Sequence, residues 1–335
     1  MYYSKQHIIY VGLAYKSTRY KWGKYPYAST HEMYLHYSPT QNALRTGYEG
    51  VVNNFIGKWN LLALANYDWV KVINFFGVGN DTKTTTNDRN FYRIRSESGY
   101  VSLGLSHNIG PQGNFVVSPF FQTVKLWSDP DRFLVKNFLR GQVTRDYFDT
   151  RKFAGIAAAL RLQKVDDQVL PTQGYRFTAN GVYTRNITES NETFSYGGEF
   201  HFFVPLSRHF VLFVKNGAAT ITGEPEFYQL NSIGGRRLRG YRRERFWANT
   251  AYYNNNELQY LFNFKSFLFN GKAGLLAFTD QGRVWQKGEK SDTWHYGYGG
   301  GIILSPFNKI FVSASYGVSP ENNGIIHVDL RRTLK

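Results

Sequence analysis

The sequence predicts an all-β protein, specifically a transmembrane antiparallel β-barrel. Aromatic residues make up 18% of the 335 residues, with 25 Tyr and 27 Phe, yet the mean hydropathy is negative. No stretch of about 18 consecutive apolar residues occurs, which excludes a transmembrane helix. Many segments alternate apolar and polar residues, as barrel strands do when one face meets lipid and the other lines the lumen.

The alternation is clear in the segment NELQYLFNF, which belongs to a strand predicted over 251–264. Leu258, Tyr260 and Phe262 fall on one face, whereas Glu257 and Gln259 fall on the other. About fifteen strands are predicted in this way, and bacterial single-chain barrels favour even numbers, so we expect about 16. The predicted strands cover 7–16, 30–38, 43–52, 59–69, 91–108, 114–127, 150–164, 174–186, 193–205, 209–222, 251–264, 271–285, 294–305, 309–319 and 323–334.

The connections between these strands are of two kinds. PLSRH, NFKSFLFN and SPFNK are short, whereas the connections over 128–148, 223–250 and 286–293 are long and charged. Short turns at the periplasmic rim and long extracellular loops are typical of outer-membrane barrels. No composition shift or Pro/Ser-rich linker marks a boundary, so one barrel domain is expected over residues 1–335.

The net charge indicates the class of partner, and the cysteine content excludes two kinds of site. The chain carries 40 Lys+Arg against 24 Asp+Glu, a net charge of +16, and has no cysteine. The positive charge suits a polyanion, which for a barrel is anionic lipid or lipopolysaccharide. Nucleic acid is the less favoured alternative, and we expect no nucleic-acid partner. The lack of cysteine excludes a disulfide framework and cysteine-based metal sites.

No motif supports catalysis or a cofactor. HEMYLH places His31 and His36 five residues apart, so on a strand their rings point to opposite sides, which argues against a metal site. FFGVGND and YGYGGG lack the spacing of nucleotide-binding loops. No serine lies in a nucleophile context such as G-x-S-x-G. We therefore expect no enzyme activity, no metal and no cofactor.

Two carboxylates on the predicted strands require a partner. Glu257 lies on a polar strand face and Asp280 in the middle of a strand, and a carboxylate there is unfavourable unless it meets a cation. The loop 223–250 precedes the strand of Glu257 and contains IGGRRLRGYRRERFW, with six arginines from Arg236 to Arg245. If this long extracellular loop folds into the lumen, it brings an arginine to both acids. A nucleic-acid patch and a phosphate-gripping loop are the other interpretations of the stretch.

Four segments, LPTQGYRF, GGRRLRGYR, ELQYLF and FTDQGRVW, resemble in this order motifs of the BamA/TamA superfamily of outer-membrane assembly and translocation barrels, whose sixteen-stranded domain is called the bacterial surface antigen domain. LPTQGYRF resembles the family's P-T-x-G-Y turn and GGRRLRGYR its (V/L)RG(F/Y) loop tip. ELQYLF is similar to the glutamate strand after that loop, and FTDQGRVW to the F-x-D-x-G-x-V strand. Family members normally carry POTRA repeats or a soluble domain ahead of the barrel, and we expect neither in this chain.

The resemblance also implies roles for individual residues. Arg239 would be the loop-tip arginine, with Glu257 and Asp280 as its partners in the lumen. Leu238, Gly240 and Tyr241 would complete the loop-tip motif. The remaining arginines of the loop are expected to be solvated charges: Arg236, Arg237, Arg242, Arg243 and Arg245.

The function implied by the resemblance is insertion or translocation of polypeptides at the outer membrane of a Gram-negative bacterium. The partners would be a client polypeptide, outer-membrane lipid or lipopolysaccharide, and an upstream POTRA or soluble domain. A weak seam between the first and last strands would let a client strand pair with an unpaired edge. The alternatives are a membrane anchor or exporter for a missing N-terminal soluble domain, and a passive porin-like channel.

Overall fold

Sixteen strands form one antiparallel sheet in the computed structural model, which describes residues 2–4, 8–40, 42–139, 145–265 and 270–332. Neighbouring strands in the sheet follow the order of the chain, except that β12 and β13 form a separate two-stranded sheet within the connection from β11 to β14. The all-β class and the antiparallel sheet are confirmed.

The strands of the large sheet are β1 (Tyr2–Ser4), β2 (Ile8–Lys21), β3 (Lys24–Ser38), β4 (Ala43–Ile56), β5 (Trp59–Asn74), β6 (Arg93–Ile109), β7 (Gly113–Leu126), β8 (Arg151–Val165), β9 (Gly174–Asn186), β10 (Glu192–Pro205), β11 (Phe210–Gly223), β14 (Thr250–Lys265), β15 (Asn270–Trp285), β16 (His295–Pro306), β17 (Ile310–Val318) and β18 (Ile325–Arg332). The short strands are β12 (Asn231–Ile233) and β13 (Phe246–Ala248). Three single-turn helices lie in the described parts of the connections: Leu134–Phe138, Arg145–Phe148 and Phe227–Gln229. No helix in the described part of the chain is long and apolar enough to cross a membrane.

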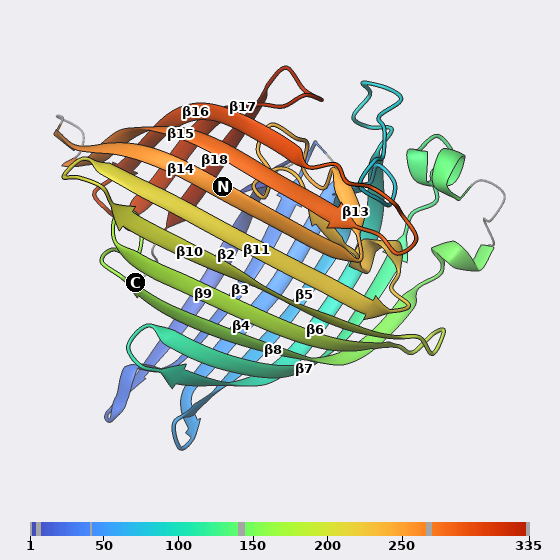
Figure 1. Cartoon of the computed structure of the whole chain (residues 1–335). Helices are drawn as coiled ribbons and strands as arrows, with labels where there is room; N and C mark the ends of the chain where they lie inside the picture. Colours follow the sequence, from blue (N-terminus) through green and yellow to red (C-terminus); the bar gives the residue numbers. More distant parts are fainter. Residues whose placement is uncertain (1, 5–7, 41, 140–144, 266–269, 333–335) are drawn as a thin grey trace.

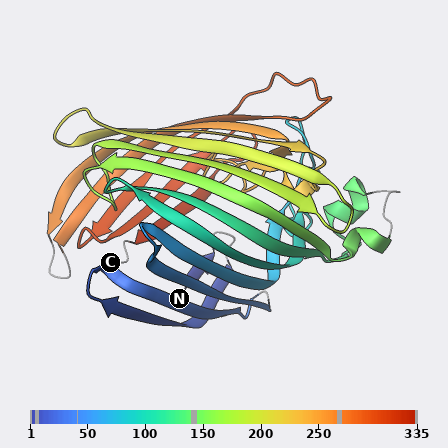
Figure 2. The same cartoon turned by 90° about the horizontal axis from the view of Figure 1, so that it is seen from below.

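The sheet curls round so that its blue first strands and red last strands approach each other (Figures 1 and 2). The ladders within the described residues run from β1 to β18 and include none between these two ends. β1 pairs with β2 only along Ile8–Tyr10, so the edge of β2 has no described partner from Val11 onward. The far edge of β18 likewise has no partner among the described residues. Each end of the sheet therefore presents an unpaired strand edge.

The two faces of the sheet differ in polarity. On β14, Leu258, Tyr260 and Phe262 are 41%, 37% and 40% exposed, whereas Glu257 and Gln259 between them are buried. Along most strands the exposed large hydrophobic residues share one parity, and they are rich in Tyr, Phe, Leu and Ile. We call this the outer face and the opposite one the inner face. An apolar outer face and a polar inner face are the pattern of a barrel that meets lipid on its outside.

The strand boundaries differ from the predicted ones mainly near the N-terminus. The sequence left 17–29 as a connection, but β2 and β3 continue through it and meet at a tight turn after Lys21. β1 was not predicted, because three residues are too few for an alternation to be recognised. The predicted turn NFKSFLFN falls largely on residues 266–269, which lie outside the described residues, as do 140–144 of the predicted loop 128–148 and the last two residues of the strand predicted over 323–334.

The connections at one rim of the sheet pack against one another and form a hydrophobic core. Phe75, in the connection after β5, is fully buried and contacts Phe138 from the connection after β7 and Phe227 and Trp247 from the connection between β11 and β14. At the opposite rim, the turn before β9 is fixed by Asp166, whose carboxylate accepts hydrogen bonds from the backbone N–H groups of Thr172 (2.9 Å) and Gln173 (3.0 Å). The chain thus has one rim of long, mutually packed loops and one rim of turns.

Candidate functional site

The loop 223–250, which connects β11 to β14 and which we call the tip loop, is a folded unit rather than an open loop. The short strands β12 and β13 pair from Asn231↔Ala248 to Ile233↔Phe246, and the arginine-rich turn projects beyond this pair. Gly234, Gly235 and Gly240 have φ values of 120°, 61° and 90°, a region that residues with a side chain rarely adopt. These glycines fold the turn back on itself and point its tip at the inner face of the sheet.

Arg239 at the tip lies between Asp280 of β15 and Glu257 of β14. Its Nε and Nη2 donate to Oδ2 and Oδ1 of Asp280, both at 2.8 Å, and its Nη1 donates to Oε2 of Glu257 at 2.6 Å. The backbone N–H of Arg239 donates to the same Asp280 Oδ2 at 2.9 Å. This two-pronged contact is the geometry for which a guanidinium is suited and an ammonium is not.

Both acids are held in place by the sheet. Asp280 is opposite Asn255 and Glu257 is opposite Phe278 in the β14–β15 ladder, so the carboxylates start from neighbouring strands on one face. Asp280 is 0% exposed and Glu257 is 8% exposed. Gln259 donates to the second carboxylate oxygen of Glu257 at 2.6 Å. The acids therefore form a rigid, pre-arranged receptor for one cation.

The environment of the Arg239 guanidinium keeps it charged. Burial on its own would lower the pKa of Arg239, but the hydrogen bonds to Asp280 and the negative charges of both carboxylates raise it above its ordinary value. The guanidinium carbon also lies 3.6 Å from the ring centroid of Phe278, which adds a cation–π contact. Charge, hydrogen bonds and stacking all favour the same position of the side chain.

The other residues of the loop-tip motif fix the backbone around Arg239. Leu238 is 0% exposed and Tyr241 is 3% exposed, and both pack in a cluster with Phe246 and Val284. A Cβ on Gly240 would lie 2.5 Å from the carbonyl oxygen of Val318, so the tip approaches β17 more closely than any side chain allows.

The same tip contacts the last strand of the sheet. The N–H of Gly240 donates to Nε2 of His327 in β18 at 3.1 Å, and Ser319 Oγ donates to the carbonyl of Gly240 at 2.8 Å. Arg236 pairs with Asp329, also in β18, at 2.5 Å. The loop therefore connects β14 and β15 to β18, the last strand of the sheet.

Arg245 corrects one expectation from the sequence, because it is not a solvated charge. It is 2% exposed, and its Nε contacts both carboxylate oxygens of Glu321, at 2.7 and 2.8 Å. Its other nitrogens donate to the hydroxyl and carbonyl oxygens of Thr82, at 2.7 and 2.5 Å. The rings of Phe76 and Phe246 lie on its guanidinium. The prediction was wrong because Glu321 is remote in sequence.

The remaining arginines of the loop are more accessible. Arg243 has a side chain that is 43% exposed, and it pairs with the adjacent Glu244 at 2.9 Å. Arg236 is similarly exposed despite its contact with Asp329. Arg237 donates to the carbonyl of Ser232 at 2.8 Å. These residues contrast with Arg239 and Arg245, whose side chains are only 12% and 3% exposed.

A second polar cluster on the inner face was missed from the sequence. Glu199 of β10 contacts His201 at 3.2 Å and Lys215 of β11 at 3.5 Å, and it accepts a hydrogen bond from the hydroxyl of Tyr253. Tyr253 lies across Gly217 of the adjacent strand, where a Cβ would be 2.2 Å from its ring. The strand parity of Glu199 and His201 was visible in the sequence, but their shared partners come from other strands.

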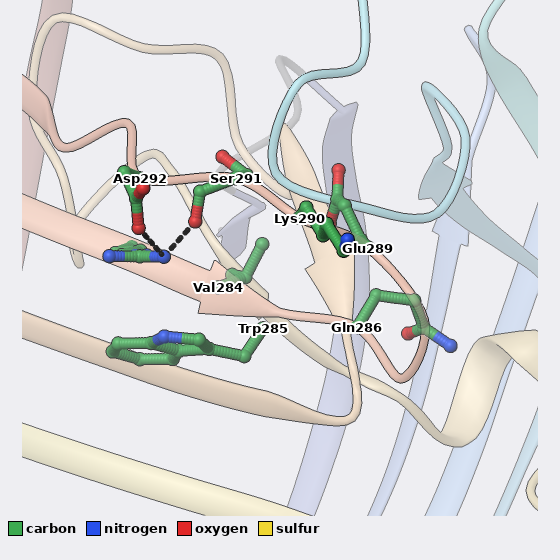
Figure 3. A pocket seen from close by; sticks show the side chains of 8 residues that line it. Val284, Trp285, Gln286, Glu289, Lys290, Ser291 and Asp292 are labelled. Atoms are coloured by element: carbon green, nitrogen blue, oxygen red, sulfur yellow. Dashed lines mark hydrogen bonds and ion pairs between the residues drawn. The ribbon is translucent and has the colours of Figure 1, made fainter.

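The end of β15 and the connection from β15 to β16 line an open cavity of about 410 Å³ (Figure 3). Arg283, which lines the cavity, donates hydrogen bonds to the carbonyl oxygen of Ser291 and, at 3.4 Å, to the carboxylate of Asp292. Glu289 accepts hydrogen bonds from the backbone N–H of Asn80 at 2.8 and 2.9 Å, which ties this connection to the one between β5 and β6. No group of three or more His, Cys, Asp or Glu suited to a metal occurs among the described residues.

No family model matches the sequence, and no curated protein matches it. Two solved structures of similar fold are BamA from Haemophilus ducreyi lacking POTRA domains 1–3 and CdiB from Acinetobacter baumannii. BamA aligns with a TM-score of 0.66 and 14% identity over 96% of this chain and 68% of its own. CdiB aligns with a TM-score of 0.53 and 13% identity over 90% of this chain and 53% of its own, so the chain spans about half the length of CdiB. The chain has the fold of these two proteins.

Proposed function

We propose that this protein is a barrel of the outer membrane of a Gram-negative bacterium, and that it mediates insertion or translocation of polypeptides there. An incoming client strand would pair with the open edge of the sheet, and the folding of the client would drive the process. No enzymatic step or cofactor is involved. An upstream POTRA or soluble domain would deliver the client to the barrel.

The observation that carries the proposal is the pair of unpaired edges at the two ends of the sheet. Natural proteins normally cover or shorten such edges, because an exposed edge pairs with other chains. Here the edge of β2 lacks a described partner from Val11 onward, and residues 11–16 are exposed on both faces. An edge that is left open in this way suits β-augmentation by a client.

The tip loop supports the proposal by holding the last strand in place. Arg239 anchors the loop to β14 and β15, while Gly240 and Arg236 contact β18. A fixed β18 offers a client a template of defined register, whereas a mobile strand would not. We assign Arg239, Glu257 and Asp280 the role of a loop lock, and Leu238, Gly240 and Tyr241 the role of shaping the tip.

Reconstitution tests the function. The barrel, together with its native upstream region, is placed in liposomes, and insertion of a second outer-membrane β-barrel is followed by its protection from protease. We expect faster insertion than in empty liposomes, or transport of an attached domain. A stable, open and substrate-biased conductance without either activity would show that the protein is a passive channel. The loop lock argues against that alternative, because the tip loop crosses the inner side of the sheet from β14 and β15 to Thr82.

A further inference from the structure

A cleft on the outer side of the loop rim is lined by arginines. Arg93 and Arg95 lie at the start of β6 with the parity of Val101 and Leu103, which are 49% and 57% exposed on the outer face. The backbone N–H of Trp127, just after β7, donates to the carbonyl of Arg95 at 2.9 Å, which continues the ladder to the rim. The arginines therefore stand directly above the apolar part of the outer face.

The connection after β7 closes the cleft from the other side. The cleft has a volume of about 220 Å³ and is lined by Arg93, Arg95, Arg132 and Trp127, with Leu134 and Val135 as its apolar wall. A space of this size accommodates an anionic group the size of a phosphate together with adjoining apolar atoms.

The acidic residues near the cleft do not neutralise the positive charge of its arginines. Arg132 donates from Nε to Asp129 at 2.7 Å, and this hydrogen bond is the main reason that the pKa of Asp129 lies below its ordinary value. Within the described part of the chain, the side chain of Arg93 donates only to the amide oxygen of Asn90, at 3.1 Å. The Arg95 guanidinium makes no hydrogen bond or ion pair with the described residues. Asp129 is thus hydrogen-bonded to Arg132 and also attracts Arg95 at longer range, whereas Arg93 and Arg95 contact no carboxylate of the described residues.

The arginines repel one another in this arrangement. Arg89, Arg95 and Arg132 all lie close enough to Arg93 to oppose its positive charge, and of the nearby acids only Asp88 offsets it there. Such a gathering of like charges is unfavourable unless an anion shares the site. Guanidinium groups favour phosphate, because their planar forks match its oxygens. The ring of Trp127 suits the boundary between apolar chains and polar headgroups.

We propose that this cleft binds a phosphate group of a phosphorylated lipid in the outer leaflet. The phosphate would lie between Arg93, Arg95 and Arg132, and the acyl chains would follow the apolar outer face below it. The inference depends on the proposed placement of the barrel in the membrane but not on its handling of polypeptides, so a failure of the insertion assay leaves it intact.

The test measures binding of lipid A that carries two phosphate groups to the full chain in detergent, by native mass spectrometry. The main variant is Arg95→Gln, because this side chain has no described partner to lose. We expect binding to weaken about tenfold, the effect of one charge-assisted hydrogen-bonding partner. Arg93→Gln/Arg95→Gln should weaken it further, and Arg95→Lys should weaken it less than Arg95→Gln. The matched control is Arg185→Gln, which removes an arginine from the same rim and face that pairs with Glu192 at 3.8 Å.

Three results would overturn the proposal. Equal binding by the wild type, the double variant and the control would show that the lipid binds elsewhere. Equal binding of dephosphorylated lipid A would show that phosphate is not recognised. Binding of inorganic phosphate as tight as that of lipid A would identify a site for a free anion instead of a lipid. Migration on gels before and after heating shows whether each variant is folded, so a loss of binding in a folded variant supports the proposal.

Discussion

Replacement of Arg239 by alanine is the sharpest perturbation of the loop lock. The side chain is 12% exposed, and its removal leaves Asp280, which is 0% exposed, with only the backbone N–H of residue 239 as a partner from the loop. Breaking a buried charge cluster by removing one member costs about 3–5 kcal/mol. Water on the inner face reduces the penalty for the stranded carboxylates, so we expect a loss of about 3 kcal/mol.

The assay is unfolding by urea in lipid vesicles, combined with limited proteolysis of the tip loop. Arg239→Ala should lower the free energy of unfolding and expose residues 223–250 to protease. Arg239→Lys should recover part of the loss, because an ammonium cannot bind Asp280 through two parallel hydrogen bonds. The matched control, Arg243→Ala, removes an exposed arginine of the same loop and should change stability by less than about 1 kcal/mol.

A double-mutant cycle with Asp280→Asn decides whether the two residues act together. Residues in direct contact give non-additive losses, with coupling of about 0.5–3 kcal/mol. If the losses from Arg239→Ala and Asp280→Asn simply add, or if Arg243→Ala is as harmful as Arg239→Ala, the loop is a basic surface and the proposed lock is wrong.

Three further predictions concern other parts of the chain. Arg245→Ala should destabilise the protein by about 3 kcal/mol and make the β17–β18 connection protease-sensitive, because Glu321 loses its buried partner; unchanged proteolysis would contradict this. Gly217→Ala should cost about 1–3 kcal/mol by forcing the Tyr253 ring away, whereas Gly181→Ala, with its nearest neighbour 3.9 Å away, should be tolerated in the same unfolding assay. Burial alone would raise the pKa of Asp166, but hydrogen bonds from Thr172 and Gln173 outweigh this effect and lower it. The ionised carboxylate therefore stabilises its turn, and this stabilisation is fully present above the unfolded pKa of about 3.9. The stabilisation is lost as the pH falls through the folded pKa. Proteolysis of residues 166–173 should rise on acidification in the wild type, and Asp166→Asn should remove that pH dependence; a persistent dependence would assign it to another group.

Much of the sheet followed from the sequence because its signal is local. Alternation along a strand records which side chains face outward, and Leu258, Tyr260 and Phe262 against Glu257 illustrate how completely burial follows that pattern. The expectation that Glu257 and Asp280 need a cation was also local, because each carboxylate lies within a predicted membrane-spanning strand, where an unpaired charge is unfavourable.

The contacts that the sequence could not supply join segments far apart in the chain. Arg245 meets Thr82 and Glu321, which lie 163 and 76 residues away, so nothing in its own neighbourhood distinguished it from Arg243. The Glu199 cluster likewise depends on Lys215 and Tyr253 from other strands. The arginine cleft depends on how the connection after β7 folds against β6, which alternation does not determine.

Cysteine cross-linking between the open edge and a client measures the proposed mechanism most directly. The chain has no native cysteine, so single cysteines can be placed at Val328 in β18, or at Ile156 in β8 as an exposed mid-sheet control. A client outer-membrane protein with single cysteines along its C-terminal strand is captured during insertion. Strand pairing predicts disulfides from Val328→Cys to client positions of one register and parity, and none from Ile156→Cys. Equal cross-linking at both sites, or none at β18 while insertion proceeds, would contradict pairing at the edge.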